Sequence, residues 1–310
     1  MAGEYPNSLV RENTSRRNEF RTHTVVAEEN GEKVIRKYAS TQQALEFLKT
    51  IIERERKNTV YFEDNFDVLH GTLKEDYIEY EYLHFVLLHD LILQKMCDAD
   101  IYGANGLLAQ YVQRISSLET SDTIPAEFLE TVGDEKSTKN LRCKCLSRGL
   151  FDLTPRNIMV DGNRWIVIDN EWSFDFPVPV VFILFRTIRE TAIQLQSEIR
   201  RLASKTVPVI NKLAYGYKDI YIPMKWLDYL NNDEISLSRM LRWEFGFKRY
   251  VNGRKCHGVG RIKKFPILRT NFPSHYLAGA GNLLDVIGRT SMAYMRSLIY
   301  YKKKLPDSDK

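Results

Sequence analysis

The spacing of apolar side chains changes near residue 83 and divides the chain into two parts. In the first part, short β-branched and aromatic runs predict strands over 20–29 and 33–39, on either side of Asn30-Gly31, which is typical of hairpin turns. An amphipathic helix is expected from about residue 41 to about residue 57. Further strand candidates cover 59–62, 66–72 and 77–82. This part therefore predicts a small β-rich unit with one helix.

From residue 83 onward, apolar positions mostly recur every three or four residues, as they do on the buried face of a helix. The predicted helices cover 83–96, 101–117, a long stretch that begins near 182, 237–244 and 282–300. A chain of 310 residues is long enough for two such units. We expect an α+β protein with two lobes: an N-lobe over 1–82, a C-lobe over 83–301 and a polar tail over 302–310.

A hairpin interrupts the helical part. Two short apolar runs, 157–160 and 164–168, flank Asp161-Gly162, which is a strong turn signal. A hairpin folds the chain back on itself, so Asn157, entering the first strand, comes to lie beside Asp169, leaving the second. The sequence therefore predicts that an amide and a carboxylate meet at the open end of this hairpin.

Around this hairpin the sequence supplies the side chains that phosphoryl transfer requires. That chemistry needs an aspartate near the acceptor hydroxyl, with an Asn and an Asp to hold Mg²⁺ on the nucleotide phosphates. We expect Asp152 to be the catalytic residue and Asn157 and Asp169 to bind the metal. Glu171 lies on the same side of an extended strand as Asp169 and is expected to be a further metal ligand or, equally, an orienting residue. The alternative is a surface hairpin whose acidic residues only form turns.

The N-terminal part offers a residue for the nucleotide. The strand Val34-Ile35-Arg36-Lys37 resembles the V-A-x-K strand of protein kinases, and the whole arrangement resembles the protein-kinase-like fold. The resemblance implies that Lys37 binds the nucleotide phosphates, with Glu46 as its partner and Glu53 as the other candidate. It also implies that backbone groups between Glu79 and Leu83 contact adenine, which assigns Glu81 and Leu83 to the nucleotide site. The alternative for Lys37 is an ordinary surface lysine.

Several motifs of protein kinases are missing from this sequence, and the differences indicate which kinase-like group it resembles. No G-x-G-x-x-G occurs in the first strands, so we expect other backbone amides, or Arg16, Arg17 or Arg21, to cover the phosphates. Phe151 stands where an H-R pair is usual, Asp-Asn-Glu-Trp over 169–172 replaces D-F-G, and no A-P-E follows. The Asp-x-Glu form is similar to the choline kinase and aminoglycoside phosphotransferase group.

A closer resemblance covers about residues 15–250 in patches. The segments 169–179, 128–133 and 20–24 resemble the kinase modules attached to methyltransferases and glycosyltransferases in bacterial surface-polysaccharide clusters, including the kinase that caps polymannose O-antigen chains. This resemblance implies transfer of the γ-phosphoryl group of ATP, with Mg²⁺, to a sugar hydroxyl in lipopolysaccharide biosynthesis. It also implies a glycan or sugar acceptor and a glycosyltransferase or methyltransferase partner, since this chain has no room for a methyltransferase domain.

Other functions stay open at this point. The chain could be a catalytically silent kinase-like module that binds nucleotide or a partner, or a small-molecule kinase of the choline or aminoglycoside type. A kinase fold that transfers AMP or acts on a small amine is a third option. The identity of the acceptor is not encoded in any motif of the sequence.

Composition sets the remaining expectations. The chain is 44% hydrophobic and 27% charged with a net charge of +5, an ordinary globular balance that calls for no nucleic-acid partner. No segment resembles a signal peptide or a membrane span, so we expect a cytoplasmic protein, with peripheral attachment to the inner face of the membrane as an option. The basic segment 248–264 is interpreted as a solvated loop or as a grip for an anionic glycan or lipid-linked diphosphate. Four cysteines are expected to be free thiols, and most of the four tryptophans to be core residues.

Overall fold

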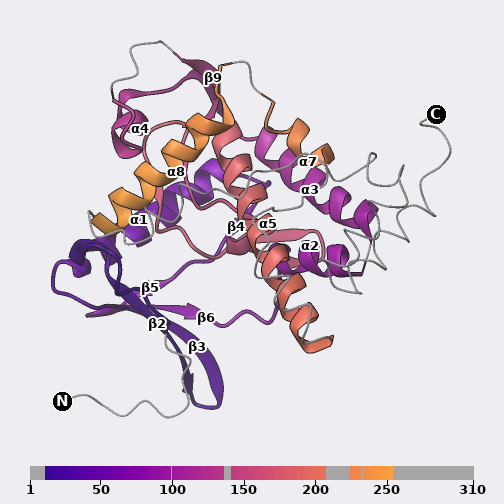
Figure 1. Ribbon diagram of the computed structural model, residues 1–310. Helices are drawn as coiled ribbons and strands as arrows, with labels where there is room; N and C mark the ends of the chain where they lie inside the picture. Colours follow the sequence, from indigo (N-terminus) through magenta and orange to yellow (C-terminus); the bar gives the residue numbers. More distant parts are fainter. Residues whose placement is uncertain (1–10, 99, 136–140, 207–223, 232–233, 254–310) are drawn as a thin grey trace, which may run out of the picture.

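The computed structural model describes residues 11–98, 100–135, 141–206, 224–231 and 234–253. In Figure 1 the N-terminal strands lie together at the lower left, and most helices lie above them and to the right. The chain thus combines a β-rich part with a mainly helical part, and the predicted α+β class is confirmed.

The N-terminal sheet has five antiparallel strands in the order β1-β2-β3-β6-β5. The strands are β1 (Arg11–Glu12), β2 (Thr22–Glu29), β3 (Glu32–Ala39), β5 (Thr72–Leu73) and β6 (Tyr77–Glu81). β2 and β3 form the predicted hairpin, with Asn30 and Gly31 at φ values of 55° and 83°, as a two-residue type I′ turn needs. The register places Lys37 between Thr24 and Ile78, in the middle of the sheet.

Helix α1 (Ala44–Phe62) packs against this sheet. The predicted strand over 59–62 is wrong, because these residues form the last turn of α1. Asn58 and Phe62 are both 0% exposed and continue the four-residue spacing of the buried face of the helix. The apolar stripe therefore runs past Lys57, where the predicted helix ended.

A second sheet of four strands, in the order β4-β12-β11-β7, contains the hairpin expected in the C-terminal part. Its strands are β4 (Asp67–Val68), β7 (Val86–Leu87), β11 (Ile158–Asp161) and β12 (Arg164–Val167). β11 and β12 turn at Gly162, which has a φ of 59°, and Asp161 lies opposite Arg164. β7 pairs with β11, so the predicted helix over 83–96 begins only after this strand.

The segment 66–72, predicted as one strand, is divided between the two sheets: β4 pairs with β12, and β5 pairs with β6. Gly71 lies immediately before β5, packed closely against β6. A Cβ atom at this position would lie 2.2 Å from Cγ2 of Ile78, so only glycine fits there.

Helices form most of the remaining structure. They are α2 (Leu88–Cys97), α3 (Ile101–Ser116), α4 (Ala126–Thr131), α5 (Val180–Thr206), α7 (Met224–Asp228) and α8 (Leu237–Asn252). Short elements between them are β8 (Thr120–Thr123), β9 (Arg142–Leu146), β10 (Gly149–Leu150), β13 (Ser173–Phe174), β14 (Val178–Pro179) and the 3-10 turns η1 (Asn18–Phe20) and η2 (Pro155–Asn157). The helix predicted over 282–300 and the tail lie outside the described residues. None of the described helices combines the length and apolar character that crossing a membrane requires.

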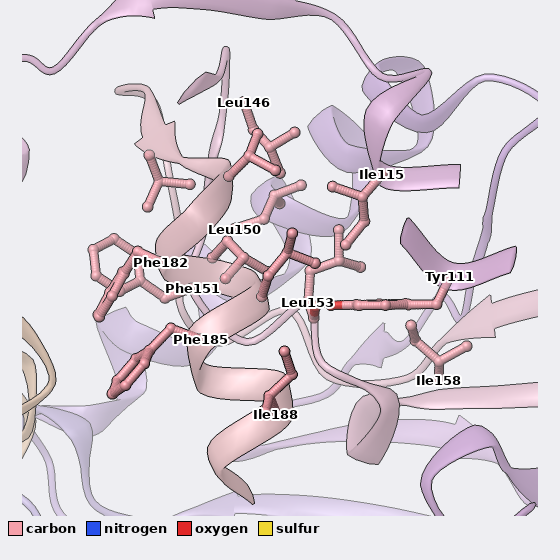
Figure 2. Packing of buried hydrophobic residues seen from close by; sticks show 14 of the residues in the cluster. Tyr111, Ile115, Leu146, Leu150, Phe151, Leu153, Ile158, Phe182, Phe185 and Ile188 are labelled. Atoms are coloured by element: carbon pink, nitrogen blue, oxygen red, sulfur yellow. Dashed lines mark hydrogen bonds between the residues drawn. The ribbon is translucent and has the colours of Figure 1, made fainter. Parts of the chain in front are cut away.

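The hydrophobic core holds the loop that carries Asp152. Helix α5 contacts α2, α3, α8, β9 and β14, and its apolar face points into the core shown in Figure 2. Phe151 and Leu153, the neighbours of Asp152, are 0% and 3% exposed, and Figure 2 shows Phe151 beside Phe182 of α5. Because both neighbours are anchored in the core, the backbone at Asp152 is fixed. The four tryptophans are also core residues, as predicted: Trp165, Trp172, Trp226 and Trp243.

Candidate active site

A cleft of about 460 Å³ contains most of the predicted site residues. Its walls come from the segment after β1, β2, β3, β7, the loop after β10, η2, the segment after β12, α5 and α8. Five predicted site residues line it: Lys37, Asp152, Asn157, Asp169 and Glu171. Glu46, Glu81 and Leu83 are not among the lining residues that the structure describes.

Asp152 is held by an arginine that the sequence analysis did not assign to the site. Nη1 of Arg186, on α5, lies 2.7 Å from Oδ1 of Asp152 and also donates to the backbone carbonyl of Phe151. Nε of Arg186 donates to Oε2 of Glu244, on α8, at 2.9 Å. Burial raises the pKa of Asp152, and the attraction of Arg186 opposes but does not reverse that effect. Asp152 is thus a fixed carboxylate with more basic character than an exposed aspartate.

Asn157 ends η2 and presents its amide oxygen for binding. Its Nδ2 donates to the backbone carbonyl of Asp152 at 3.0 Å, so Oδ1 remains as an acceptor. The backbone N–H of Ile168 donates to the carbonyl of Asn157 at 2.9 Å, which brings Asn157 next to Asp169. The hairpin therefore brings the two predicted metal ligands together, as its two-residue turn requires.

Asp169 lies between a backbone donor and a lysine. Its Oδ1 accepts from the N–H of Glu171 and from Nζ of Lys37, each at 3.3 Å. Burial and the negative charge of Glu171 raise the pKa of Asp169, against the opposing effect of Lys37.

The donor set fits Mg²⁺ better than a metal that needs a full protein cage. No group of three His, Cys, Asp or Glu side chains among the described residues is arranged to hold a metal. Mg²⁺ typically takes only one or two protein ligands and completes its shell with water and substrate phosphates. The amide oxygen of Asn157 and the carboxylate of Asp169 are such a set.

Glu171 binds two cations in the structure. Nζ of Lys37 lies 2.8 Å from its Oε1, and Nη1 of Arg16 lies 2.7 Å from its Oε2. Burial alone would raise the pKa of Glu171, but Lys37 and Arg16 outweigh it and lower that pKa to about 2. With both oxygens engaged by cations, Glu171 is not placed as a metal ligand, and the contacts favour the orienting role that the sequence left open.

Lys37 is correspondingly held by acidic residues of the C-terminal part. Burial would lower its pKa, yet the charges of Asp169 and Glu171 more than offset this and raise it. The lysine is therefore a fixed cation that faces the cleft.

The prediction that Glu46 pairs with Lys37 is wrong. The side chain of Glu46 is 76% exposed and pairs with Lys49 at 2.7 Å, and Glu53, the other candidate, pairs with Lys57. Both residues lie on the solvent face of α1, because the buried face is set by the apolar stripe that contains Leu48 and Ile51.

Glu55 is the acidic residue on the buried face of α1, four positions after Ile51. It accepts from the hydroxyl of Tyr80 at 2.8 Å and from the backbone N–H of Gly71 at 3.0 Å. Burial raises its pKa despite these hydrogen bonds. Its position in the apolar stripe was the signal by which the sequence could have found it.

The segment 13–21 joins β1 to β2. Asn13 and Arg16 line the cleft, whereas the guanidinium of Arg17 stacks on Phe20 and Tyr250. Arg21 donates to the backbone carbonyl of Arg16 at 3.3 Å. Of the three arginines proposed to cover phosphates, Arg16 is the one that the described structure places in the cleft.

Three other predictions from the sequence concern the basic segment, the cysteines and the adenine contacts. Lys248, from the basic segment, lines the cleft and lies 3.3 Å from Oε1 of Glu244, while the residues after 253 lie outside the described part. Cys143 and Cys145 on β9 are free thiols with their Sγ atoms 3.7 Å apart. Cys256 lies outside the described residues. The predicted adenine contacts of Glu81 and Leu83 stay a prediction.

Comparisons with known proteins add similarities at low identity. No family model and no curated protein matches the sequence. A choline kinase from Streptococcus pneumoniae is similar in structure, with 14% identity, a TM-score of 0.36, and coverage of 78% of this chain and 82% of that one. A macrolide 2'-phosphotransferase from Brachybacterium faecium shows 12% identity and a TM-score of 0.36, covering 85% of this chain and 92% of its own.

A third similar structure is a thermostable aminoglycoside phosphotransferase mutant in a ternary complex with ADP and hygromycin B. It shows 12% identity and a TM-score of 0.35, and the match covers 79% of this chain and 94% of that one. Identities and TM-scores at this level establish no family membership.

Proposed function

We propose that this chain is a phosphotransferase that uses ATP and Mg²⁺ to phosphorylate a hydroxyl group. The observation that carries the proposal is the convergence of Asp152, Asn157, Asp169 and Lys37 on one cleft. These residues come from β3, the loop after β10, η2 and the segment after β12, so their meeting depends on the fold as a whole. A surface hairpin with turn-forming acids has no reason to face a buried lysine.

Asp152 orients the acceptor hydroxyl and receives its proton. Its loop is anchored by Phe151 and Leu153, and Arg186 holds one carboxylate oxygen, so the other oxygen is available to the acceptor. The raised pKa of Asp152 makes it a better proton acceptor than an exposed aspartate. Positioning by a fixed group is the main contribution expected in phosphoryl transfer.

Asn157 and Asp169 hold the metal, and Lys37 binds the nucleotide phosphates. Bound Mg²⁺ supplies neutralisation of the charge on the phosphates. Lys37 contributes a positive charge to the phosphate site, and its ion pair with Glu171 holds the lysine in place. Arg16, fixed by Glu171, adds a second cation where other kinases use a glycine-rich loop.

The acceptor is proposed to be a sugar hydroxyl in the assembly of a surface glycan, as the motif over 169–179 implies. The cleft is lined mainly by charged and polar side chains, which suits a ligand rich in hydroxyl groups. A small molecule such as choline, an aminoglycoside or a macrolide is the second candidate, after the names of the similar structures. A glycosyltransferase or methyltransferase partner belongs to the first candidate only.

Product analysis tests the proposal. The protein is incubated with ATP and Mg²⁺ and with mannose oligosaccharides, choline or hygromycin B, and ADP and the phosphorylated product are measured by mass spectrometry. We expect one acceptor to gain a phosphate group. Asp152→Asn should slow turnover by about 100-fold or more, whereas Asp161→Asn, at the hairpin turn, should not.

The other outcomes separate the alternatives. Binding of nucleotide without turnover of any acceptor would favour a silent module, and a product that gains AMP would indicate nucleotidyl transfer. Absence of nucleotide binding would overturn the proposal.

A further inference from the structure

More cationic than acidic side chains line the cleft. Each of these cations except one forms an ion pair with a residue of the described chain. The cationic lining residues are Arg16, Lys37, Arg156, Arg186 and Lys248. Arg16 and Lys37 pair with Glu171, and Arg186 and Lys248 pair with Glu244. These four cations already have an anionic partner before any ligand binds.

Arg156 is the exception. Its guanidinium makes no hydrogen bond or ion pair with any residue in the described part of the chain, and the side chain is exposed to the cleft. Arg156 also lies between Asp152 and Asn157, within the loop that carries the proposed proton acceptor and a proposed metal ligand.

The backbone that carries Arg156 is rigid. Arg156 is the central residue of η2, between buried Pro155 and Asn157. The N–H of Asn157 donates to the carbonyl of Thr154 at 2.9 Å, and Nδ2 of Asn157 donates to the carbonyl of Asp152. Arg156 therefore projects from a fixed base, which reduces the entropy lost when its guanidinium binds a ligand.

The neighbouring side chain of His89 does not neutralise the charge of Arg156. His89, near the start of α2, is 4% exposed, and neither ring nitrogen has a hydrogen-bond partner among the described residues. Burial and the positive charge of Arg156 lower the pKa of His89 to about 4, so the imidazole is neutral at pH 7. The positive charge of Arg156 remains available to a ligand in the cleft.

We propose that Arg156 forms an anion subsite of the cleft that binds a phosphate group through its guanidinium. A guanidinium presents parallel N–H donors that match two phosphate oxygens, and such charged pairs are stronger than neutral hydrogen bonds. The inference rests on the proposed phosphotransferase function and extends it to a residue for which the sequence motifs gave no role. The phosphate is either the γ-phosphate of the nucleotide or a phosphate carried by the acceptor.

Calorimetry with two nucleotides tests whether the subsite binds the γ-phosphate. Affinities for Mg²⁺·AMP-PNP and Mg²⁺·ADP are measured for the wild-type protein, Arg156→Gln and Arg156→Lys. If the subsite holds the γ-phosphate, Arg156→Gln loses about tenfold or more in affinity for AMP-PNP and little for ADP, and Arg156→Lys loses less. Arg164→Gln is the matched control, because Arg164 is exposed on β12, pairs with Asp67 and does not line the cleft.

Binding of orthophosphate to the nucleotide-bound protein tests whether the subsite binds a phosphate carried by the acceptor. Orthophosphate is titrated into protein saturated with Mg²⁺·AMP-PNP, so that the γ-phosphate position is already filled. If the subsite serves the acceptor, the wild-type protein binds orthophosphate and Arg156→Gln binds it about tenfold more weakly or not at all.

Unchanged binding of both AMP-PNP and orthophosphate in Arg156→Gln would overturn the anion subsite while leaving the phosphotransferase proposal intact. A wild-type protein that binds neither nucleotide would instead overturn the proposed function, and the subsite with it. The two failures are therefore distinguishable in one set of titrations.

Discussion

Nζ of Lys37 lies 2.8 Å from Oε1 of Glu171, so the central strand of the N-terminal sheet is tied to the acidic segment that follows β12. Arg16 binds the other oxygen of the same carboxylate, and the hydroxyl of Thr22 contributes a longer hydrogen bond of 3.5 Å. Glu171 is therefore the partner of Lys37 that the sequence placed on the helix at Glu46. It belongs instead to the segment that carries Asp169. Lys37, proposed to bind the nucleotide phosphates, and Asp169, proposed to bind the metal, are therefore positioned together.

Replacement of Glu171 by Gln should destabilise the protein by about 3 kcal/mol at pH 7, because Lys37 and Arg16 lose the charge that compensates them in a buried site. The pKa of Glu171 is about 2 in the folded protein, below the value of about 4.3 for an exposed glutamate. Its ionised form thus stabilises the fold above about pH 4.3, and this contribution is lost as the pH falls towards 2.

Chemical denaturation of both proteins between pH 7 and pH 2.5 measures this effect. The difference in free energy of unfolding between the wild-type protein and Glu171→Gln should stay constant down to about pH 4.3 and shrink below it. A difference that is small at pH 7, or that grows as the pH falls, would show that Glu171 does not hold the two cations.

Alanine substitutions on α1 should separate its solvent face from its buried face. Glu46→Ala should change the free energy of unfolding by less than about 0.5 kcal/mol, because Glu46 is exposed. Glu55→Ala should cost about 2 kcal/mol or more, because it leaves the hydroxyl of Tyr80 and the N–H of Gly71 without their acceptor. Thermal unfolding of the two variants provides the comparison, and equal losses of stability would contradict the assigned faces.

Arg186 is a positioning residue for Asp152, and the pH dependence of turnover should reveal it. The proposed mechanism needs ionised Asp152, so the rate should fall as the pH drops through the raised pKa of this group. In Arg186→Met the lost positive charge should raise that pKa further and move the acidic limb of the kcat profile up by about one pH unit. Arg186→Lys should shift it less.

A purely structural role for Arg186 would give a different result. Loss of stability or of folded protein would reduce the amplitude of the profile without moving its acidic limb. Arg142→Met, on an exposed position of β9, serves as the control for removing an arginine.

The local part of the site could be predicted from the sequence, and the long-range part could not. The two turn residues are Gly162 and Asn163, one position later than the predicted Asp161-Gly162, and the hairpin still brings Asn157 close to Asp169 as the sequence predicted. The partner of Lys37 depends instead on how the first sheet packs against the segment after β12, and no local pattern encodes that packing.

Arg186 and Glu55 illustrate the same division. Arg186 was visible only as the end of an apolar run, because its contact with Asp152 requires the packing of α5 against the loop after β10. Glu55 follows Ile51 by four positions and so continues the buried face of α1, but proximity in sequence favoured Glu46. The end of α1 was placed too early for a related reason, since β-branched and aromatic residues near 59–62 suit both a strand and a buried helical turn.

The most direct test of the account is calorimetric binding of AMP-PNP to the wild-type protein and to Asp169→Asn, with and without Mg²⁺. We expect the wild-type protein to bind the nucleotide much more tightly with Mg²⁺ than without it. Asp169→Asn should lose this dependence on the metal while its thermal unfolding remains cooperative. Equal binding with and without Mg²⁺ in the wild-type protein, or an unchanged metal dependence in Asp169→Asn, would contradict it.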